Sequence, residues 1–205
     1  MSFFENTRKP VGLGGKIMVA MMNIGHSAMA AWGLHFLQLA PDAMVLDCGC
    51  GGGANIKTLL KQCPKGKVQG IDYSAVSVEK TRKVNAGAIA AGRCAVQQAN
   101  VAELPFEAEQ FDVVTAFETV YFWPELAQNF REVYRVLKPG GTFFICNEAN
   151  GETAKDDKWM QIINGMTIYT DADLKVYLEQ AGFYQIQSHK NKKGWLCVTA
   201  QKAVK

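Results

Sequence analysis

A glycine-rich stretch early in the chain, VLDCGCGGGAN at residues 45–55, combines one carboxylate, two thiols and four glycines. Gly49, Gly51 and Ala54 fit the spacing G-x-G-x-x-G/A, in which a tight turn brings the backbone close to a nucleotide. Asp72 follows about twenty residues later, where an acidic side chain accepts hydrogen bonds from ribose hydroxyls. The spacing therefore predicts a site for a ligand that contains a nucleoside.

The carboxylate of Asp47 stands two residues before the first of these glycines. A dinucleotide would place its pyrophosphate there, and the negative charges would repel each other. A ligand that carries an ammonium and a sulfonium, such as S-adenosylmethionine, suits the same carboxylate. Two alternatives stay open: an NAD(P)-dependent oxidoreductase, which Asp47 disfavours, and a nucleoside-binding domain without catalytic activity.

The two thiols of the loop, Cys48 and Cys50, are spaced C-x-C, and no second cysteine pair or His-x-His cluster follows that would complete a zinc site. We therefore expect no metal site, and we interpret both residues as small apolar side chains that fill the turn. A chain of 205 residues is large enough to fold without disulfides, so its six cysteines are expected to be reduced.

The elements that must position these residues alternate along the chain. Apolar runs predict five strands, and helical spacing with Gly and Pro stop signals predicts three helices between them. The expected strands are 44–48, 67–72, 94–100, 111–118 and 142–149, and the expected helices are 55–63, 74–92 and 124–141. This alternation favours an α/β fold, with a doubly wound, mostly parallel sheet and helices on both faces.

The end of the chain departs from this alternation. A helix is expected at 170–183, followed by strands at 184–190 and 195–202. The polar turn that joins the two strands is too short for a crossover, so the pair must be antiparallel. The prediction is a seven-stranded, Rossmann-like sheet that ends in an antiparallel hairpin, which is unusual for a dinucleotide-binding domain.

Composition limits the classes of function. With 48% hydrophobic and 20% charged residues, the chain is expected to form a single domain, residues 1–205. A formal charge of only +3, spread over the chain, does not form the basic cluster that is typical of nucleic-acid-binding proteins. No apolar run approaches the length of a membrane span, and polar residues interrupt the one stretch that resembles a signal peptide. We therefore expect a cytoplasmic monomer or homodimer.

Four motifs in this order resemble the class I S-adenosylmethionine-dependent methyltransferases, in particular the small-molecule group similar to methyltransferase type 11. They are VLDCGCGGG, GIDYS, ANVAELPFEAEQFDVVTAFETVYFWP and REVYRVLKPGG. The resemblance covers residues 41–205 and implies direct displacement at the methyl carbon, with a small molecule as acceptor and S-adenosylhomocysteine as product. The protein would supply alignment and exclusion of water.

The resemblance also implies which residues line the cofactor. Asn100 stands where such enzymes usually carry an acidic residue facing the adenine amino group, and its side-chain carbonyl accepts the same hydrogen bond. Tyr73 would pack on the adenine. Phe117 would stand beside the transferable methyl group. The full set is Asp47, Gly49, Gly51, Asp72, Tyr73, Asn100, Val101 and Phe117.

Three side chains are candidates for chemistry at the acceptor: His26, Glu118 and Tyr121. Glu118 ends the fourth predicted strand, where sites of α/β folds lie, although it is also interpretable as the polar end of a strand. We expect residues 1–40 to fold as a helical lid that brings His26 and Trp32 toward Tyr121 and Trp123. A purely structural role for His26 is the alternative.

Overall fold

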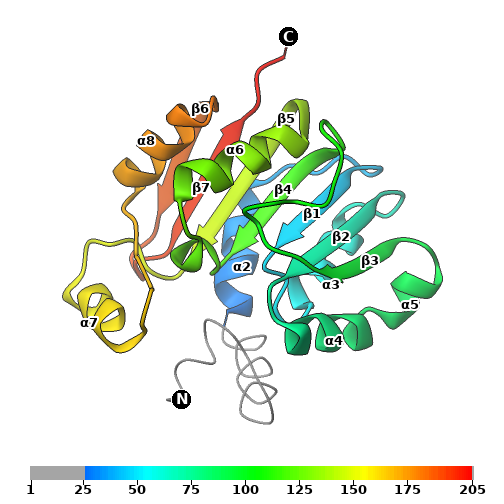
Figure 1. The fold of residues 1–205 in the computed structure, drawn as a ribbon, viewed down its shortest axis with the longest axis horizontal. Helices are drawn as coiled ribbons and strands as arrows, with labels where there is room; N and C mark the ends of the chain where they lie inside the picture. Colours follow the sequence, from blue (N-terminus) through cyan, green and yellow to red (C-terminus); the bar gives the residue numbers. More distant parts are fainter. Residues whose placement is uncertain (1–25, 205) are drawn as a thin grey trace.

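A computed structural model describes residues 26–204, which form one seven-stranded sheet (Figure 1). The strand order is β3-β2-β1-β4-β5-β7-β6, and β7 is antiparallel to both of its neighbours. The strands are β1 (Met44–Cys48), β2 (Lys67–Asp72), β3 (Cys94–Gln98), β4 (Phe111–Phe117), β5 (Leu137–Asn147), β6 (Tyr184–Lys190) and β7 (Leu196–Gln201). The predicted doubly wound sheet with its antiparallel hairpin is confirmed.

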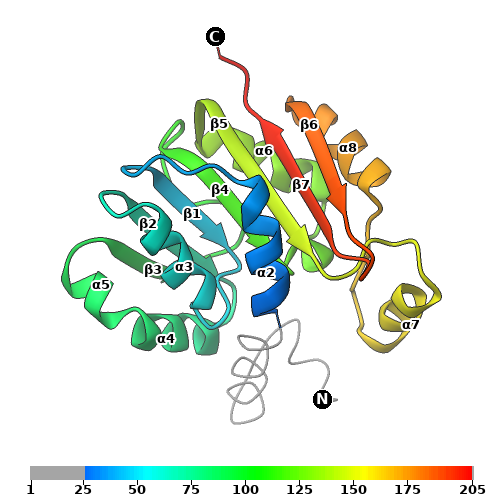
Figure 2. The ribbon, with the colours of Figure 1, turned by 180° about the vertical axis from the view of Figure 1, so that it is seen from behind.

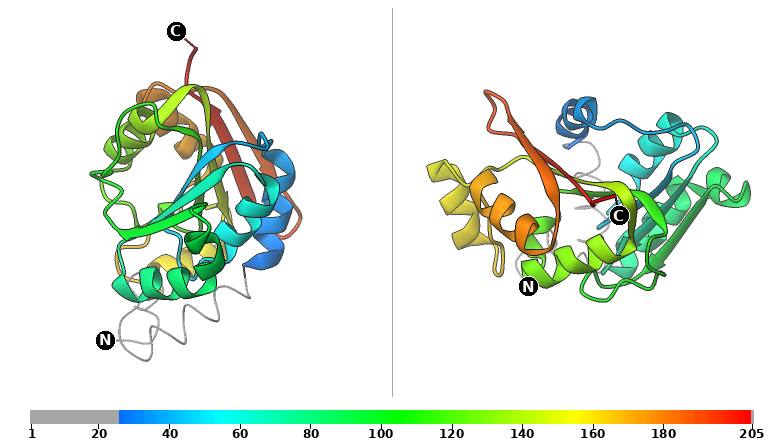
Figure 3. Two further views of the ribbon diagram at one scale, coloured as in Figure 1. Left: turned by 90° about the vertical axis from the view of Figure 1, so that its right-hand side faces the viewer. Right: turned by 90° about the horizontal axis from the view of Figure 1, so that it is seen from above.

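Helices cover both faces of the sheet (Figures 2 and 3). Buried side chains of α6 and α8 form a core on one face, and those of α2, α3 and α4 form a core on the other. The α-helices are α2 (Ser27–Gly33), α3 (Ala54–Gln62), α4 (Ala75–Val84), α5 (Ala86–Ala90), α6 (Leu126–Val136), α7 (Ala154–Ile162) and α8 (Asp171–Gln180), and the 3-10 turns are η2 (Leu34–Phe36) and η3 (Val120–Phe122).

Side chains of each strand alternate between these two cores, as the pleat requires. In β5, Phe143 and Ile145 join the α6 and α8 core, whereas Phe144 and Cys146 join the opposite one. The sheet is therefore buried on both sides. This explains why its strands read as nearly continuous apolar runs in the sequence.

The predicted helix 74–92 is interrupted at Asn85, between α4 and α5. The Asn85 amide donates hydrogen bonds to the carbonyl oxygens of Gly53 (3.1 Å) and Thr81 (3.0 Å). The Thr81 hydroxyl donates in turn to the carbonyl of Gly51 (2.7 Å). These hydrogen bonds attach the end of α4 to the glycine-rich loop. The helix ends at Asn85, because the side chain of Asn85 forms hydrogen bonds with backbone carbonyl groups.

The predicted lid is only partly right. Residues 1–25 of that segment lie outside the described residues. Helix α2 packs flat on the sheet, where Gly33 closely approaches Cys146 of β5. Trp32 contacts Phe36 and Trp195 instead of Trp123, with ring centroids 5.3 and 6.0 Å away. The expected Trp32 contact is wrong because α2 and Trp123 lie on opposite faces of the sheet.

Two further boundaries differ from the sequence prediction. The helix expected at 124–141 ends at Val136, because the stretch 137–141 is already the start of β5. Helix α7 lies between β5 and α8, where the sequence predicts no helix or strand. Its N-terminus has a capping box, in which the Thr153 hydroxyl and the Asp156 carboxylate each accept a backbone N–H of the other residue.

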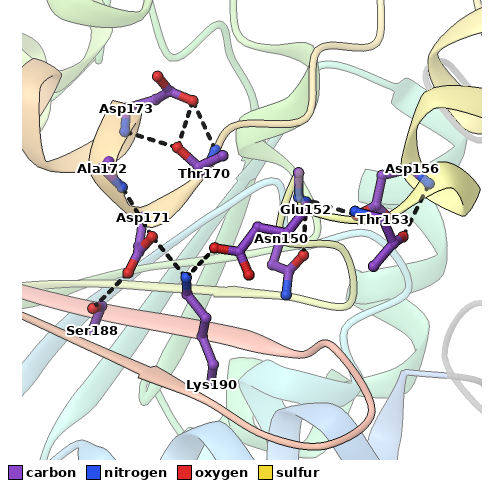
Figure 4. A network of polar contacts seen from close by, with 11 residues as sticks. Asn150, Glu152, Thr153, Asp156, Thr170, Asp171, Ala172, Asp173, Ser188 and Lys190 are labelled. Atoms are coloured by element: carbon purple, nitrogen blue, oxygen red, sulfur yellow. Dashed lines mark hydrogen bonds and ion pairs between the residues drawn. The ribbon is translucent and has the colours of Figure 1, made fainter.

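The segment 148–170, which contains α7 and joins β5 to α8, is called the insertion; a polar network attaches it to the edge of the sheet (Figure 4). The Lys190 ammonium on β6 pairs with the carboxylates of Asp171 (2.8 Å) and Glu152. Asp171 also accepts a hydrogen bond from the Ser188 hydroxyl at 3.1 Å. One lysine therefore fastens the start of the insertion to the start of α8.

All six cysteines are buried free thiols. As the sequence predicts, Cys48 and Cys50 are buried among apolar side chains, although Cys48 ends β1 and only Cys50 lies in the turn. Among residues 26–204, no helix is long and apolar enough to cross a membrane.

Candidate functional site

The candidate residues gather at the carboxyl ends of the parallel strands. Because β1 lies between β2 and β4 in the sheet, the loop after β1 is flanked by Asp72 at the end of β2 and by Glu118 just beyond β4. Crevices at this edge are the usual ligand sites of open α/β sheets. The topology therefore brings the separate sequence motifs to one place.

The glycine-rich loop is held by the protein on most sides and open on one. Gly49, Gly51 and Gly53 all have positive φ, at 83°, 51° and 81°. A Cβ added at Gly49 would collide with the Thr119 side chain, and one at Gly53 would lie 2.6 Å from the Asn85 amide. A Cβ added at Gly51 would meet nothing within 4 Å. Gly51 is therefore the glycine whose missing side chain leaves room for a ligand.

Asp72 is fixed against this loop. Its two carboxylate oxygens accept the backbone N–H groups of Gly51 (2.9 Å) and Ser74 (2.8 Å). Burial raises the pKa of Asp72, and these N–H groups oppose that rise. The carboxylate is thus oriented before a ligand arrives, as the ribose-binding role predicted from the sequence requires.

Asp47 lies beneath the loop, with only 1% of its surface exposed. The Thr115 hydroxyl on β4 donates a hydrogen bond to it at 2.8 Å. Burial raises the pKa of Asp47 to about 7, with a smaller contribution from the nearby charge of Asp72, while the Thr115 hydrogen bond lowers it. The sequence predicts that this carboxylate lies in the ligand space, but in the structure Asp47 is buried beneath the loop and does not point into open space.

The predicted adenine side is more open. Tyr73 is 54% exposed. Val101 is buried. The Asn100 side-chain oxygen accepts the N–H of Ala102 at 3.1 Å, which uses one of its two lone pairs and leaves the other for an amino group. Phe117 differs from expectation, because its ring packs on Phe144 at 5.3 Å and belongs to the core.

The three candidate catalytic residues do come together. Glu118, which has a positive φ of 59°, lies beside Tyr121, whose hydroxyl donates to its Oε1 at 3.2 Å. The backbone N–H of Glu148 donates to the same oxygen. His26 Nε2 lies 3.9 Å from the other oxygen, Oε2, and 3.9 Å from an oxygen of Glu148. The structure thus places His26 beside Glu118, although α2 itself packs on the sheet.

Burial dominates the protonation of this cluster. Burial, with a smaller contribution from the charge of Glu148, raises the pKa of Glu118 to about 8, against the hydrogen bonds from the Glu148 N–H and the Tyr121 hydroxyl. Burial also lowers the pKa of His26, against the opposing effect of Glu148. Glu118 is therefore close to a protonation change at neutral pH, which is a property of groups that move protons.

Sequence reasoning missed Glu148 as a member of this cluster. Glu148 follows β5 directly and contacts both His26 and Glu118. The Thr119 hydroxyl donates to the carbonyl of Cys48 at 3.0 Å, which ties the end of β4 to the glycine-rich loop. A signal for Glu148 was present, because it is a carboxylate inside the expected strand 142–149, at the edge where sites lie.

Comparison with known proteins assigns the family. Residues 46–145, from β1 to β5, match the family model described as the methyltransferase domain. These residues belong to this methyltransferase family. The match covers the glycine-rich loop, Asp72, Glu118 and Tyr121, which are the parts of the site that the first motifs predicted.

Relatives of this methyltransferase domain are distant. The 24-methylenesterol C-methyltransferase 2 of Arabidopsis thaliana is 29% identical over 143 residues, which are 69% of this chain and 38% of that protein. The demethylmenaquinone methyltransferase of Lactiplantibacillus plantarum is 36% identical over 116 residues, which are 56% of this chain and 48% of that protein. The chain thus spans less than half the length of these two relatives.

Solved structures share the fold of this methyltransferase domain. A SAM-dependent methyltransferase from Aquifex aeolicus superimposes with a TM-score of 0.75 at 18% identity, covering 91% of this chain and 97% of that one. The shared architecture includes the parts that position the site.

Proposed function

We propose that the chain transfers a methyl group from S-adenosylmethionine to a small-molecule acceptor. The observation that carries this proposal is the open face at Gly51 beside the oriented carboxylate of Asp72, at the edge of a methyltransferase fold. When bound, the cofactor supplies a methyl group on a sulfonium, which is already an excellent leaving group. The protein therefore has to bind, align and exclude water.

The residues present fit this cofactor. The space that a Cβ at Gly51 would fill accommodates the close approach of a ligand, and Asp72 is placed to accept hydrogen bonds from ribose hydroxyls. The buried carboxylate of Asp47 attracts the positive charges of the ligand through a medium of low dielectric. We assign Tyr73, Asn100 and Val101 to the adenine side.

Glu118, Tyr121 and His26 are proposed to face the acceptor. Glu118 takes the proton of an acceptor that must lose one, because burial makes its carboxylate a stronger base than an exposed glutamate. The Tyr121 hydroxyl and the backbone N–H of Glu148 hold one carboxylate oxygen, so the other is directed toward His26. His26 orients the acceptor from the opposite side.

The names of the relatives support a small molecule as acceptor, because they refer to methylenesterol and demethylmenaquinone. The formal charge of +3 gives no footprint for nucleic acid. We further propose that residues 1–205 act as one domain, in the cytoplasm, as a monomer or homodimer.

Replacing Asp72 by Ala should weaken binding of S-adenosylhomocysteine by roughly 10- to 150-fold, which corresponds to about 1.5–3 kcal/mol for hydrogen bonds to a charged group. The measurement is titration calorimetry on the full chain. Asp112→Ala is the matched control, because its carboxylate also accepts a backbone N–H, that of Met44 at 2.8 Å, but at the opposite end of the sheet. Equal losses in both variants would indicate a general effect on folding.

The same experiment with NAD distinguishes the alternative function. We expect no saturable binding of NAD, because the carboxylate of Asp47 disfavours a pyrophosphate next to the loop. Saturable NAD binding without any response to S-adenosylhomocysteine would overturn the proposed function in favour of an oxidoreductase.

A further inference from the structure

Three potential metal ligands meet beside the proposed acceptor site from three separate segments of the chain. His26 precedes α2, Glu118 follows β4 and Glu148 follows β5. One ligand atom of each, the imidazole nitrogen and two carboxylate oxygens, lies within 4.8 Å of both others. His26 Nε2 is 3.9 Å from each carboxylate. This is a mixed nitrogen and oxygen cluster, and its members are not neighbours in sequence.

The cluster is held in place by groups that do not belong to it. Glu118 Oε1 receives two hydrogen bonds, from the Tyr121 hydroxyl and from the backbone N–H of Glu148, so Oε2 is the oxygen left facing His26. The Tyr121 hydroxyl is itself positioned by the backbone N–H of Ala149, which donates to it at 3.0 Å. Outer hydrogen bonds of this kind orient the ligands of metal sites and raise affinity.

The cluster also lacks a positive partner. Among residues 26–204, no lysine or arginine forms an ion pair with Glu118 or Glu148, and His26 is the one basic side chain that faces them. Two carboxylates brought together in a half-buried place repel each other unless a cation or a proton is shared between them. The arrangement is therefore suited to a cation that binds between them.

The spacing fits an ion in size. The His26 nitrogen is 3.9 Å from each carboxylate and the two carboxylate oxygens are at most 4.8 Å apart, so an ion centred among the three lies about 2.5 Å or less from each, close to the usual metal–ligand distances. Carboxylates suit Mn²⁺ and imidazole suits Fe²⁺ or Zn²⁺, so a set of one imidazole and two carboxylates suits a divalent transition-metal ion. We propose that His26, Glu118 and Glu148 bind such an ion, for which Mn²⁺ is the probe.

The ion would have a defined place in the proposed reaction. Three protein ligands leave further coordination positions, which are free to take water or an oxygen of the acceptor. An acceptor hydroxyl bound in this way becomes more acidic and is fixed in orientation. This part of the inference rests on the proposed function and favours an acceptor with an oxygen nucleophile.

The test is a titration of the metal-free full chain with Mn²⁺, followed by electron paramagnetic resonance of the free ion and by calorimetry. We expect one bound equivalent, with Glu148→Gln and His26→Ala each weakening affinity by about tenfold or more. Glu179→Gln on the exposed face of α8 is the matched control and should leave binding unchanged.

Binding of S-adenosylhomocysteine in the presence of a chelator is measured in parallel. If S-adenosylhomocysteine binds and Mn²⁺ does not, or if both variants bind Mn²⁺ as tightly as the parent protein does, the metal site is refuted and the proposed function stands. If Mn²⁺ binds as expected and the nucleoside does not bind at all, the metal site stands and the proposed function fails.

Discussion

Gly51→Val is expected to abolish binding of S-adenosylmethionine and S-adenosylhomocysteine while the chain still folds. A Cβ at this position meets no protein atom within 4 Å, so the new side chain occupies only the space assigned to the ligand. The folded state loses about 1–2 kcal/mol, because φ is 51° there and a branched side chain is strained at positive φ. Calorimetry measures the binding, and urea unfolding measures the stability.

Gly92→Val is a closely matched control for this effect. Gly92 also has a positive φ, 67°, and also offers open space to an added Cβ, but it lies before β3 at the opposite end of the strands. The two variants should therefore lose similar stability, and only Gly51→Val should lose the ligand. Normal binding by Gly51→Val would show that the glycine-rich loop is not the cofactor site.

Asp47→Asn should change both stability and binding, in opposite directions. The folded-state pKa of Asp47 is raised from 3.8 to about 7 by burial. Between these pH values the folded chain keeps a proton that the unfolded chain loses, so the contribution of Asp47 to stability is complete below about pH 4 and is lost as pH rises to about 7. The neutral amide has no such dependence. At pH 8 the ligand-free variant should be more stable than the parent by as much as about 4 kcal/mol.

The same substitution removes the negative charge beneath the loop, so binding of S-adenosylmethionine should weaken by about tenfold or more, the scale of one charged interaction. Urea unfolding of both proteins at pH 5 and pH 8 gives the difference between their free energies of unfolding at each pH. Groups that titrate in the same way in both proteins do not contribute to this difference. Parallel pH profiles for the two proteins would show that Asp47 is already ionised in the folded state. Thr115→Val, which removes the hydrogen bond that stabilises the charged form, should steepen the profile.

The residues predicted correctly from the sequence are those whose position depends on local spacing. The glycine-rich loop joins β1 to α3, and Asp72 ends the next strand, β2, which pairs with β1. Hydrophobic periodicity therefore predicts the positions of both. The meeting of Glu148 with His26 depends instead on how α2 packs on the sheet, which no spacing rule reports. Helix α7 was missed although its capping box, Thr153 and Asp156, was visible in the sequence.

The start of β5 shows a different limit. Residues 137–141 contain Pro139 and two glycines, which usually end an element, yet the structure includes them in the strand. The pairing of β4 with β5 shifts register between Phe111 and Val113, and this irregularity accommodates residues that a regular strand interior disfavours. Tertiary pairing therefore overrides the local turn signal.

The attachment of α4 to the glycine-rich loop affects how fast a ligand binds and how far along the chain binding stabilises the structure. The Thr81 hydroxyl and the Asn85 amide already hold the carbonyl oxygens of Gly51 and Gly53, so the loop loses little conformational entropy when a ligand arrives. A rigid loop captures its ligand without a slow ordering step. Conversely, a ligand that stabilises the loop also opposes local opening at the end of α4. Hydrogen exchange should therefore slow at the amides there, which are ten or more residues away in sequence from any residue that contacts the ligand.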